Sequence, residues 1–171
     1  MSKSIVGIVM IADEKSENIN VSTGKLPWAV PGPGARPIFC AEGKVKVSVS
    51  HEDGSVYRLA RLPSSARIVS IMLQNDKIQN AIGYSLGLYA VGEGAKAKEC
   101  FAKSLDLSEP LDWKECAFQN KSIAKVGNAL WQDAKEKKFV DTFYDLVLTA
   151  EVAGTGSGTV VARVFYTIGG K

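Results

Sequence analysis

YDLVLTAEVAGTGSGTVVARVFYT, residues Tyr144–Thr167, is the stretch of sequence that decides the fold. Apolar side chains occupy every second position in Tyr144–Val152 and again in Gly158–Thr167. This period of two is typical of β-strands with one buried face. The glycine-rich AGTGSG between the two segments predicts a tight turn. The whole stretch therefore predicts two antiparallel strands joined as a β-hairpin.

Further strands are predicted on the N-terminal side of this stretch. Lys44–Ser50 alternates cleanly, and HEDG, residues 51–54, predicts the turn that follows it. Ala66–Gln74 is apolar at both parities, which predicts a strand buried on both faces. The other predicted strands are Ser55–Leu62, Tyr84–Ala90 and two weaker segments, 98–107 and 111–118.

One segment has helical spacing instead. Ser122 is a suitable N-cap, and apolar residues follow it at Ile123, Val126, Leu130 and Ala134. A helix over about 122–137 is therefore expected. Together with the strands, this predicts an all-β fold, a jelly roll or β-sandwich of about eight strands with one short helix.

Residues 1–37 differ from the rest of the chain. An apolar stretch, Ile5–Ala12, precedes a polar segment and then LPWAVPGPGARP, residues 26–37. Prolines remove amide donors and fix φ, so this last segment does not fit the centre of a sheet. We expect an extended N-terminal arm over 1–37 and a β-sandwich domain over 38–171.

The residue types needed for catalysis are sparse. The chain has one histidine, His51, which excludes multi-histidine metal sites, and its three cysteines form no C-x-x-C pair. The G-x-G-x-G spacing in residues 154–158 does not match a phosphate-binding loop. Asp145 and Glu151 share strand parity and are expected on a solvated outer face. The sequence therefore predicts a protein that is not an enzyme and has no cofactor and no metal.

Charge and hydropathy exclude two further classes. The net charge is +3, from 21 basic and 18 acidic residues, which is too small to favour a nucleic-acid partner. The stretch Ile5–Ala12 is too short to span a bilayer, so no membrane association is expected.

Several segments, in order, resemble a group of small tailed-phage virion proteins. They are DGSVYRLARLPSSARIVSIMLQND, YSLGLYAVGEGA, CFAKSLDLS, NALWQDA and YDLVLTAEVAGTGSGTVVARVFYT, which span about Gly54 to Thr167. The resemblance implies a structural role in the virion, as a jelly-roll capsid decoration (cement) protein of a bacteriophage. It also implies the major capsid protein as partner. The three widely spaced cysteines fit assembly in the reducing cytoplasm of the host. The alternative is a jelly-roll module of the tail, vertex or fibre that recognises host glycan or adapts other virion proteins.

For either role we expect the chain to work by binding neighbouring proteins. Self-association as a dimer or trimer over a lattice axis is the expected geometry. An extended arm covers much surface per residue, and its apolar residues would become ordered on binding. The expected partner-binding residues are Ile5, Ile8, Val9, Met10, Trp28, Pro31 and Pro33.

Overall fold

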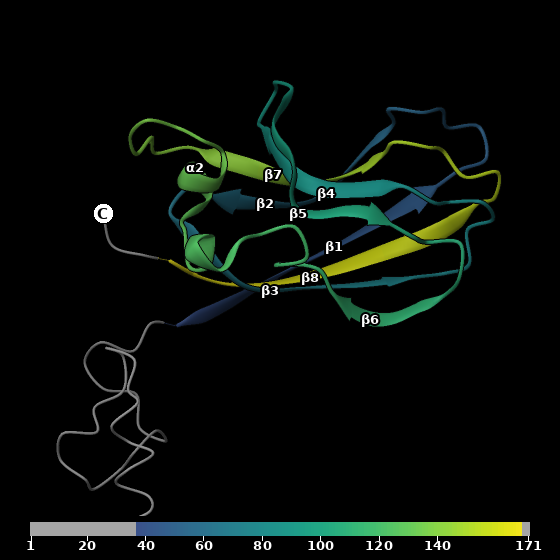
Figure 1. Cartoon of the computed structure of the whole chain (residues 1–171), viewed down its shortest axis with the longest axis horizontal. Coiled ribbons are helices and arrows are strands. Elements are labelled where there is room, and N and C mark those ends of the chain that lie inside the picture. The colour runs from purple at the N-terminus through teal and green to yellow at the C-terminus, as the bar shows by residue number, and fades with distance from the viewer. Residues whose placement is uncertain (1–36, 169–171) are drawn as a thin grey trace, which may run out of the picture. The chain divides into compact units, whose positions relative to one another are not determined.

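A computed structural model describes residues 37–168, which form two four-stranded antiparallel sheets (Figure 1). The first sheet has the order β1-β8-β3-β6 and the second the order β2-β7-β4-β5. Every connection except β4–β5 passes from one sheet to the other. This is the strand order of a jelly roll, so the predicted fold class is confirmed. The strands are β1 Ile38–Val47, β2 Val56–Pro63, β3 Ala66–Asn75, β4 Tyr84–Ala90, β5 Ala95–Leu105, β6 Leu111–Glu115, β7 Phe143–Ala150 and β8 Gly158–Ile168.

The core lies between the sheets and is built mainly from the central strands. Burial of apolar area is the main favourable term in folding, and these strands supply the largest fully enclosed side chains. They include Ile71 and Leu73 of β3, Leu86 and Leu88 of β4, and Tyr144 of β7. The two faces of the domain are therefore held rigidly against each other.

Strand β3 is buried on one face and not on two, contrary to the prediction. The pairing register with β8 shifts between Ile68 and Ser70, so Val69 is an extra residue in a β-bulge. The bulge reverses the parity, which places Ile68 and Ile71 in the core and leaves Val69 43% exposed. A period-two pattern cannot reveal such an insertion.

The predicted hairpin in Tyr144–Thr167 is also wrong, although both strands exist. β7 pairs with β2 and β4 in the second sheet, and β8 pairs with β1 and β3 in the first. The glycine-rich segment 151–157 crosses between the sheets. The backbone N–H of Thr155 donates to the carbonyl of Gln79, which fixes the segment against the β3–β4 connection. The HEDG turn is present, but it likewise joins strands of different sheets.

The helix expected over 122–137 is much shorter. It consists of a 3-10 turn η1, Ile123–Lys125, and one α-helical turn α2, Leu130–Asp133. Gly127, with φ of 85°, separates them, because this backbone conformation cannot continue a right-handed helix. Lys135, with φ of 62°, ends the second piece. The strong helix formers in this segment do not produce a continuous helix, because the left-handed backbone at Gly127 and Lys135 interrupts it.

No helix within residues 37–168 is both long and apolar enough to cross a membrane. The predicted arm, residues 1–37, lies outside the described residues except for Pro37. The division into an arm and a domain stays a prediction.

Candidate functional site

The residues predicted to bind a partner all precede the described part of the chain. Ile5, Ile8, Val9, Met10, Trp28, Pro31 and Pro33 lie outside residues 37–168. The structure of residues 37–168 therefore does not test whether these residues lie together, and their role in binding a partner stays a prediction. The candidate sites within residues 37–168 lie on the surfaces of the jelly roll.

The residues considered for chemistry are dispersed or already paired. His51 is exposed, and its Nδ1 lies 2.9 Å from the hydroxyl of Tyr57. In residues 37–168 no three His, Cys, Asp or Glu side chains come together as a metal site requires. Cys40, Cys100 and Cys116 are free thiols. None of these groups forms a nucleophile–base pair.

Asp145 is buried, contrary to the prediction of a solvated outer face. Its carboxylate accepts hydrogen bonds from Arg58 Nη1 at 2.5 Å and from Arg61 Nε at 2.8 Å. The pairing of β2 with β7 shifts between Arg58 and Ala60, which makes Leu59 an extra residue. This bulge lets arginines three positions apart cover the same carboxylate.

The two arginines decide the ionisation of this carboxylate. The hydrogen bond from Arg61 and the further contact from Arg58 hold the pKa of Asp145 below its usual range, although burial opposes the shift. Glu151, which shares strand parity with Asp145, accepts hydrogen bonds from Lys98 and Ser85. Both carboxylates are thus ionised structural partners and do not form a hydrolytic pair.

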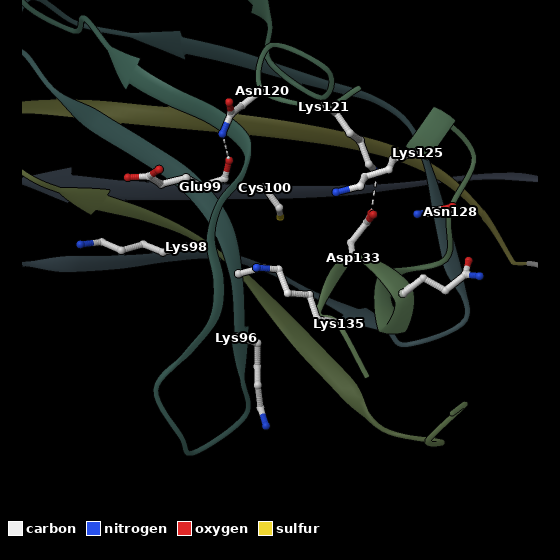
Figure 2. A pocket seen from close by; sticks show the side chains of 12 residues that line it. Lys96, Lys98, Glu99, Cys100, Asn120, Lys121, Lys125, Asn128, Asp133 and Lys135 are labelled. Carbon is white, nitrogen blue, oxygen red and sulfur yellow. Dashed lines mark hydrogen bonds and ion pairs between the residues drawn. The ribbon is translucent and has the colours of Figure 1, made fainter. Parts of the chain in front are cut away.

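A lysine-rich pocket opens between β5 and the segment that carries η1 and α2 (Figure 2). Its volume is about 450 Å³, the scale of a cavity that accepts a few side chains. The charged groups in its wall are five lysines and two carboxylates. They are Lys96, Lys98, Lys121, Lys125, Lys135, Glu99 and Asp133.

The wall formed by β5 depends on an irregular pairing with β4. Leu86 pairs with Ala102 and Leu88 pairs with Ala97, so several residues of β5 lie opposite Gly87. A Cβ on Gly87 would lie 2.1 Å from the carbonyl oxygen of Ala97, which no side chain tolerates. The glycine of the YSLGLYA segment thus permits the wide bulge that carries Lys98 and Glu99.

Lys121 and Asp133 form a buried ion pair in the pocket. Lys121 Nζ lies 2.5 Å from Asp133 Oδ2, and the side chains are 3% and 2% exposed. The ammonium group also lies 5.3 Å from the centre of the Phe101 ring. Burial raises the pKa of Asp133, and the hydrogen bond from Lys121 partly offsets this. Burial also raises the pKa of the nearby Cys100 thiol to about 12, so this cysteine is not a nucleophile at neutral pH.

Two lysines of the pocket have no carboxylate within ion-pair distance among residues 37–168. Lys96 lies near Glu93 and Glu136, and Lys98 bonds Glu151, whereas Lys125 and Lys135 are exposed and form no ion pair. The pocket was not predicted from the sequence because its two walls lie at least twenty positions apart in the chain. The available signal in the sequence is the group of lysines Lys135, Lys137 and Lys138, but such a group also fits a solvated helix end.

A second surface, which we call the apolar end, lies where β1 begins and β8 ends (Figure 1). Ladder pairs and loop hydrogen bonds bring the relevant segments to this end: Ile38 pairs with Thr167, and Ser64 bonds the carbonyl of Val140. Large apolar side chains are exposed here, which is typical of protein-binding surfaces. The apolar end comprises Ile38, Phe39, Val140, Phe143 and Ile168.

The fold is similar to that of chains in three solved phage capsids. A chain in the capsid of Ralstonia phage GP4 superposes with a TM-score of 0.57 and 13% identity, covering 84% of this chain and 92% of that one. A chain in the capsid asymmetric unit of cyanophage Pam1 gives 0.49 and 12%, covering 85% and 95%. A chain in the acid-stable capsid of Helicobacter pylori bacteriophage KHP30 gives 0.42 and 16%, covering 76% and 86%. No family model and no curated protein sequence matches the chain.

Proposed function

We propose that this chain is a structural protein of a tailed-phage virion that binds the outside of the capsid as a decoration protein. The observation that carries the proposal is the jelly roll shared with the GP4 capsid chain, which extends over 92% of that chain. The order of sequence segments that resembles phage virion proteins supports the same role.

The apolar end supplies a surface suited to this role. Phe143 is 52% exposed and Ile38 is 62% exposed, on strands whose inner faces are fixed in the core. Rigid scaffolds that present apolar side chains lose little conformational entropy on binding. The partners proposed are the major capsid protein and further copies of this chain, as dimers or trimers.

A decoration protein stabilises a shell by mass action. It binds the assembled lattice more tightly than the separated subunits, which shifts the equilibrium toward the intact shell. An interface on the order of 1,000 Å² in each copy suffices for specific binding. Repetition over the lattice multiplies a modest gain at each site. The role requires no reaction, in keeping with the pairing of Asp145 and Glu151 to basic side chains.

The direct test is the number of copies in the particle. Quantitative mass spectrometry of purified virions whose genome encodes this chain should find hundreds of copies, in proportion to the major capsid protein. A few dozen copies or fewer would favour the alternative role at the tail, vertex or fibre. Complete absence from the particle would refute the virion role.

A further inference from the structure

We propose that the lysine pocket binds an acidic segment of a neighbouring coat subunit, with a carboxylate held between Lys125 and Lys135. This inference rests on the proposed function and specifies the chemistry of the partner. The pocket lies between β5 and the segment 120–135, and the exposed side chains of Lys125 and Lys135 belong to its wall.

The charge balance of the pocket is the first argument. Lys121, Lys98 and Lys96 each have a carboxylate within ion-pair distance. Lys125 and Lys135 have no carboxylate within ion-pair distance in the described part of the chain. The charge of Lys125 helps to lower the pKa of Asp133, but that carboxylate already forms an ion pair with Lys121. An incoming carboxylate gains hydrogen bonds from ionised donors, which are stronger than neutral ones.

The backbone of Lys135 is the second argument. Its φ of 62° places a long side chain in the left-handed region at the end of α2. Glycine or asparagine is preferred at such a position, and other residues are disfavoured by about 1 kcal/mol or more. Strained residues of this kind gather at binding sites. Lys135 lines the pocket, so this left-handed position adds a charged side chain to the wall at the expense of local stability.

The apolar residues beside Lys125 favour a peptide over a nucleic acid as the ligand of the pocket. Ile123 is 91% exposed and Val126 is 50% exposed, and they flank Lys125 on the same loop. Nucleic-acid sites combine basic side chains with aromatic rings for base stacking, and none of the residues that line the pocket is aromatic. A peptide with alternating acidic and apolar side chains matches both the lysines and the exposed apolar side chains of the rim.

The first experiment needs no virus. The isotope-labelled full chain is titrated with the blocked peptide Glu-Leu-Asp-Glu-Leu and, as a control, with Gln-Leu-Asn-Gln-Leu. We expect amide shift changes at Lys125, Asp133 and Lys135 with the acidic peptide alone, weakened by added salt. Equal shifts with the neutral peptide would overturn the proposal. Tighter binding of oligothymidylate at the same amides would also overturn it, in favour of a nucleic-acid site.

Charge reversal then tests the two lysines against a matched control. The variant Lys125→Glu/Lys135→Glu should bind the acidic peptide at least about tenfold more weakly. The control Lys44→Glu/Lys46→Glu, which changes the net charge equally on the exposed positions of β1, should bind as the wild type does. Equal affinity of the pocket variant and the wild type would overturn the proposal.

Particle occupancy separates this inference from the proposed function. Two virion preparations are compared, one made with the wild-type protein and one with the pocket variant. Wild-type protein in the first and fewer copies of the variant in the second would support both the decoration role and the pocket contact. Full occupancy by the pocket variant would overturn the pocket as a capsid contact and leave the decoration role intact. Absence of the wild-type protein would refute the decoration role, while the peptide titration still judges the pocket's chemistry.

Discussion

The ammonium group of Lys121 lies 2.5 Å from a carboxylate oxygen of Asp133, and 3% and 2% of the two side chains are exposed. The pair joins the segment after β6 to the end of α2, so it holds one wall of the lysine pocket together. A buried charge is tolerated when its partner is present, and losing one partner leaves the other uncompensated.

The substitution Lys121→Met should therefore destabilise the protein by about 3–5 kcal/mol near neutral pH. The loss should depend on pH. Burial already raises the pKa of Asp133, and removing Lys121 raises this pKa further. A group with a raised folded-state pKa loses stability as pH rises through that pKa, so the defect should be small near pH 4 and large at pH 8. Urea unfolding at both pH values measures it.

The double variant Lys121→Met/Asp133→Asn is the control for this prediction. It removes both charges, so it should recover most of the lost stability and its unfolding free energy should vary less with pH. A defect of equal size at pH 4 and pH 8 in the single variant would contradict the ion-pair explanation.

Asp145 should show the opposite dependence on pH. Its pKa is lowered below the ordinary value of 3.8 by Arg61 and Arg58, so its contribution is present above that value and lost as pH falls through the folded-state pKa. Asp145→Asn should cost about 1–2 kcal/mol at pH 7, because both arginines remain solvated. The difference from the wild type should shrink toward pH 2. Chemical unfolding across this range is the measurement, and a constant difference would contradict the prediction.

Gly87→Ala should be strongly destabilising, by about 3 kcal/mol. The new Cβ would meet backbone atoms of Ala97 and Lys98 at 2.1–2.3 Å, so the bulge of β5 must move. Gly94→Ala is the matched control, since a Cβ there meets nothing within 4 Å. Thermal unfolding compares the two variants, and similar melting temperatures would show that β5 does not require glycine opposite its bulge.

Lys135→Gly should raise stability by up to about 1 kcal/mol, since glycine adopts the left-handed conformation without strain. The same variant should bind the acidic peptide more weakly, because it lacks the ammonium group. Paired measurements of unfolding and peptide affinity check both outcomes. A variant that is more stable and binds equally well would contradict a binding role for this residue.

A chain that lacks residues 1–37 should fold but bind shells poorly. The described strands begin at Ile38, so their ladders should form without the preceding residues. Circular dichroism should show an unchanged β-sheet spectrum. Co-sedimentation with capsid shells that lack this protein should show reduced occupancy by the truncated chain. Occupancy equal to that of the full chain would remove the predicted arm from the binding mechanism.

Strand positions were largely predictable from the sequence, because half-buried strands impose a period of two on their side chains. The pairing of those strands was not. β7 and β8 are neighbours in the chain and have the pattern of a hairpin, yet segment 151–157 is long enough to cross between layers. Alternation tells which face is buried and carries no information on which sheet a strand joins.

The local errors have a common cause in single residues. An extra residue in a bulge, Val69 on β3 or Leu59 on β2, reverses the face of everything beyond it. The prediction of a solvated Asp145 fails for a related reason: the bulge on β2 lets Arg58 and Arg61 both lie against its carboxylate and cover it. The lysine pocket was not predicted because contact between β5 and the segment 120–135 is a tertiary property. The residues expected to bind partners precede residue 37 and are still untested.

Strand β8 lies between β1 and β3, and within residues 37–168 it is the strand that pairs with β1. During synthesis the ribosome releases β8 after the other described strands, so β1 has no ladder partner until β8 has been translated. The order of the strands in the chain thus makes the pairing of the first described strand one of the last steps in forming the sheet.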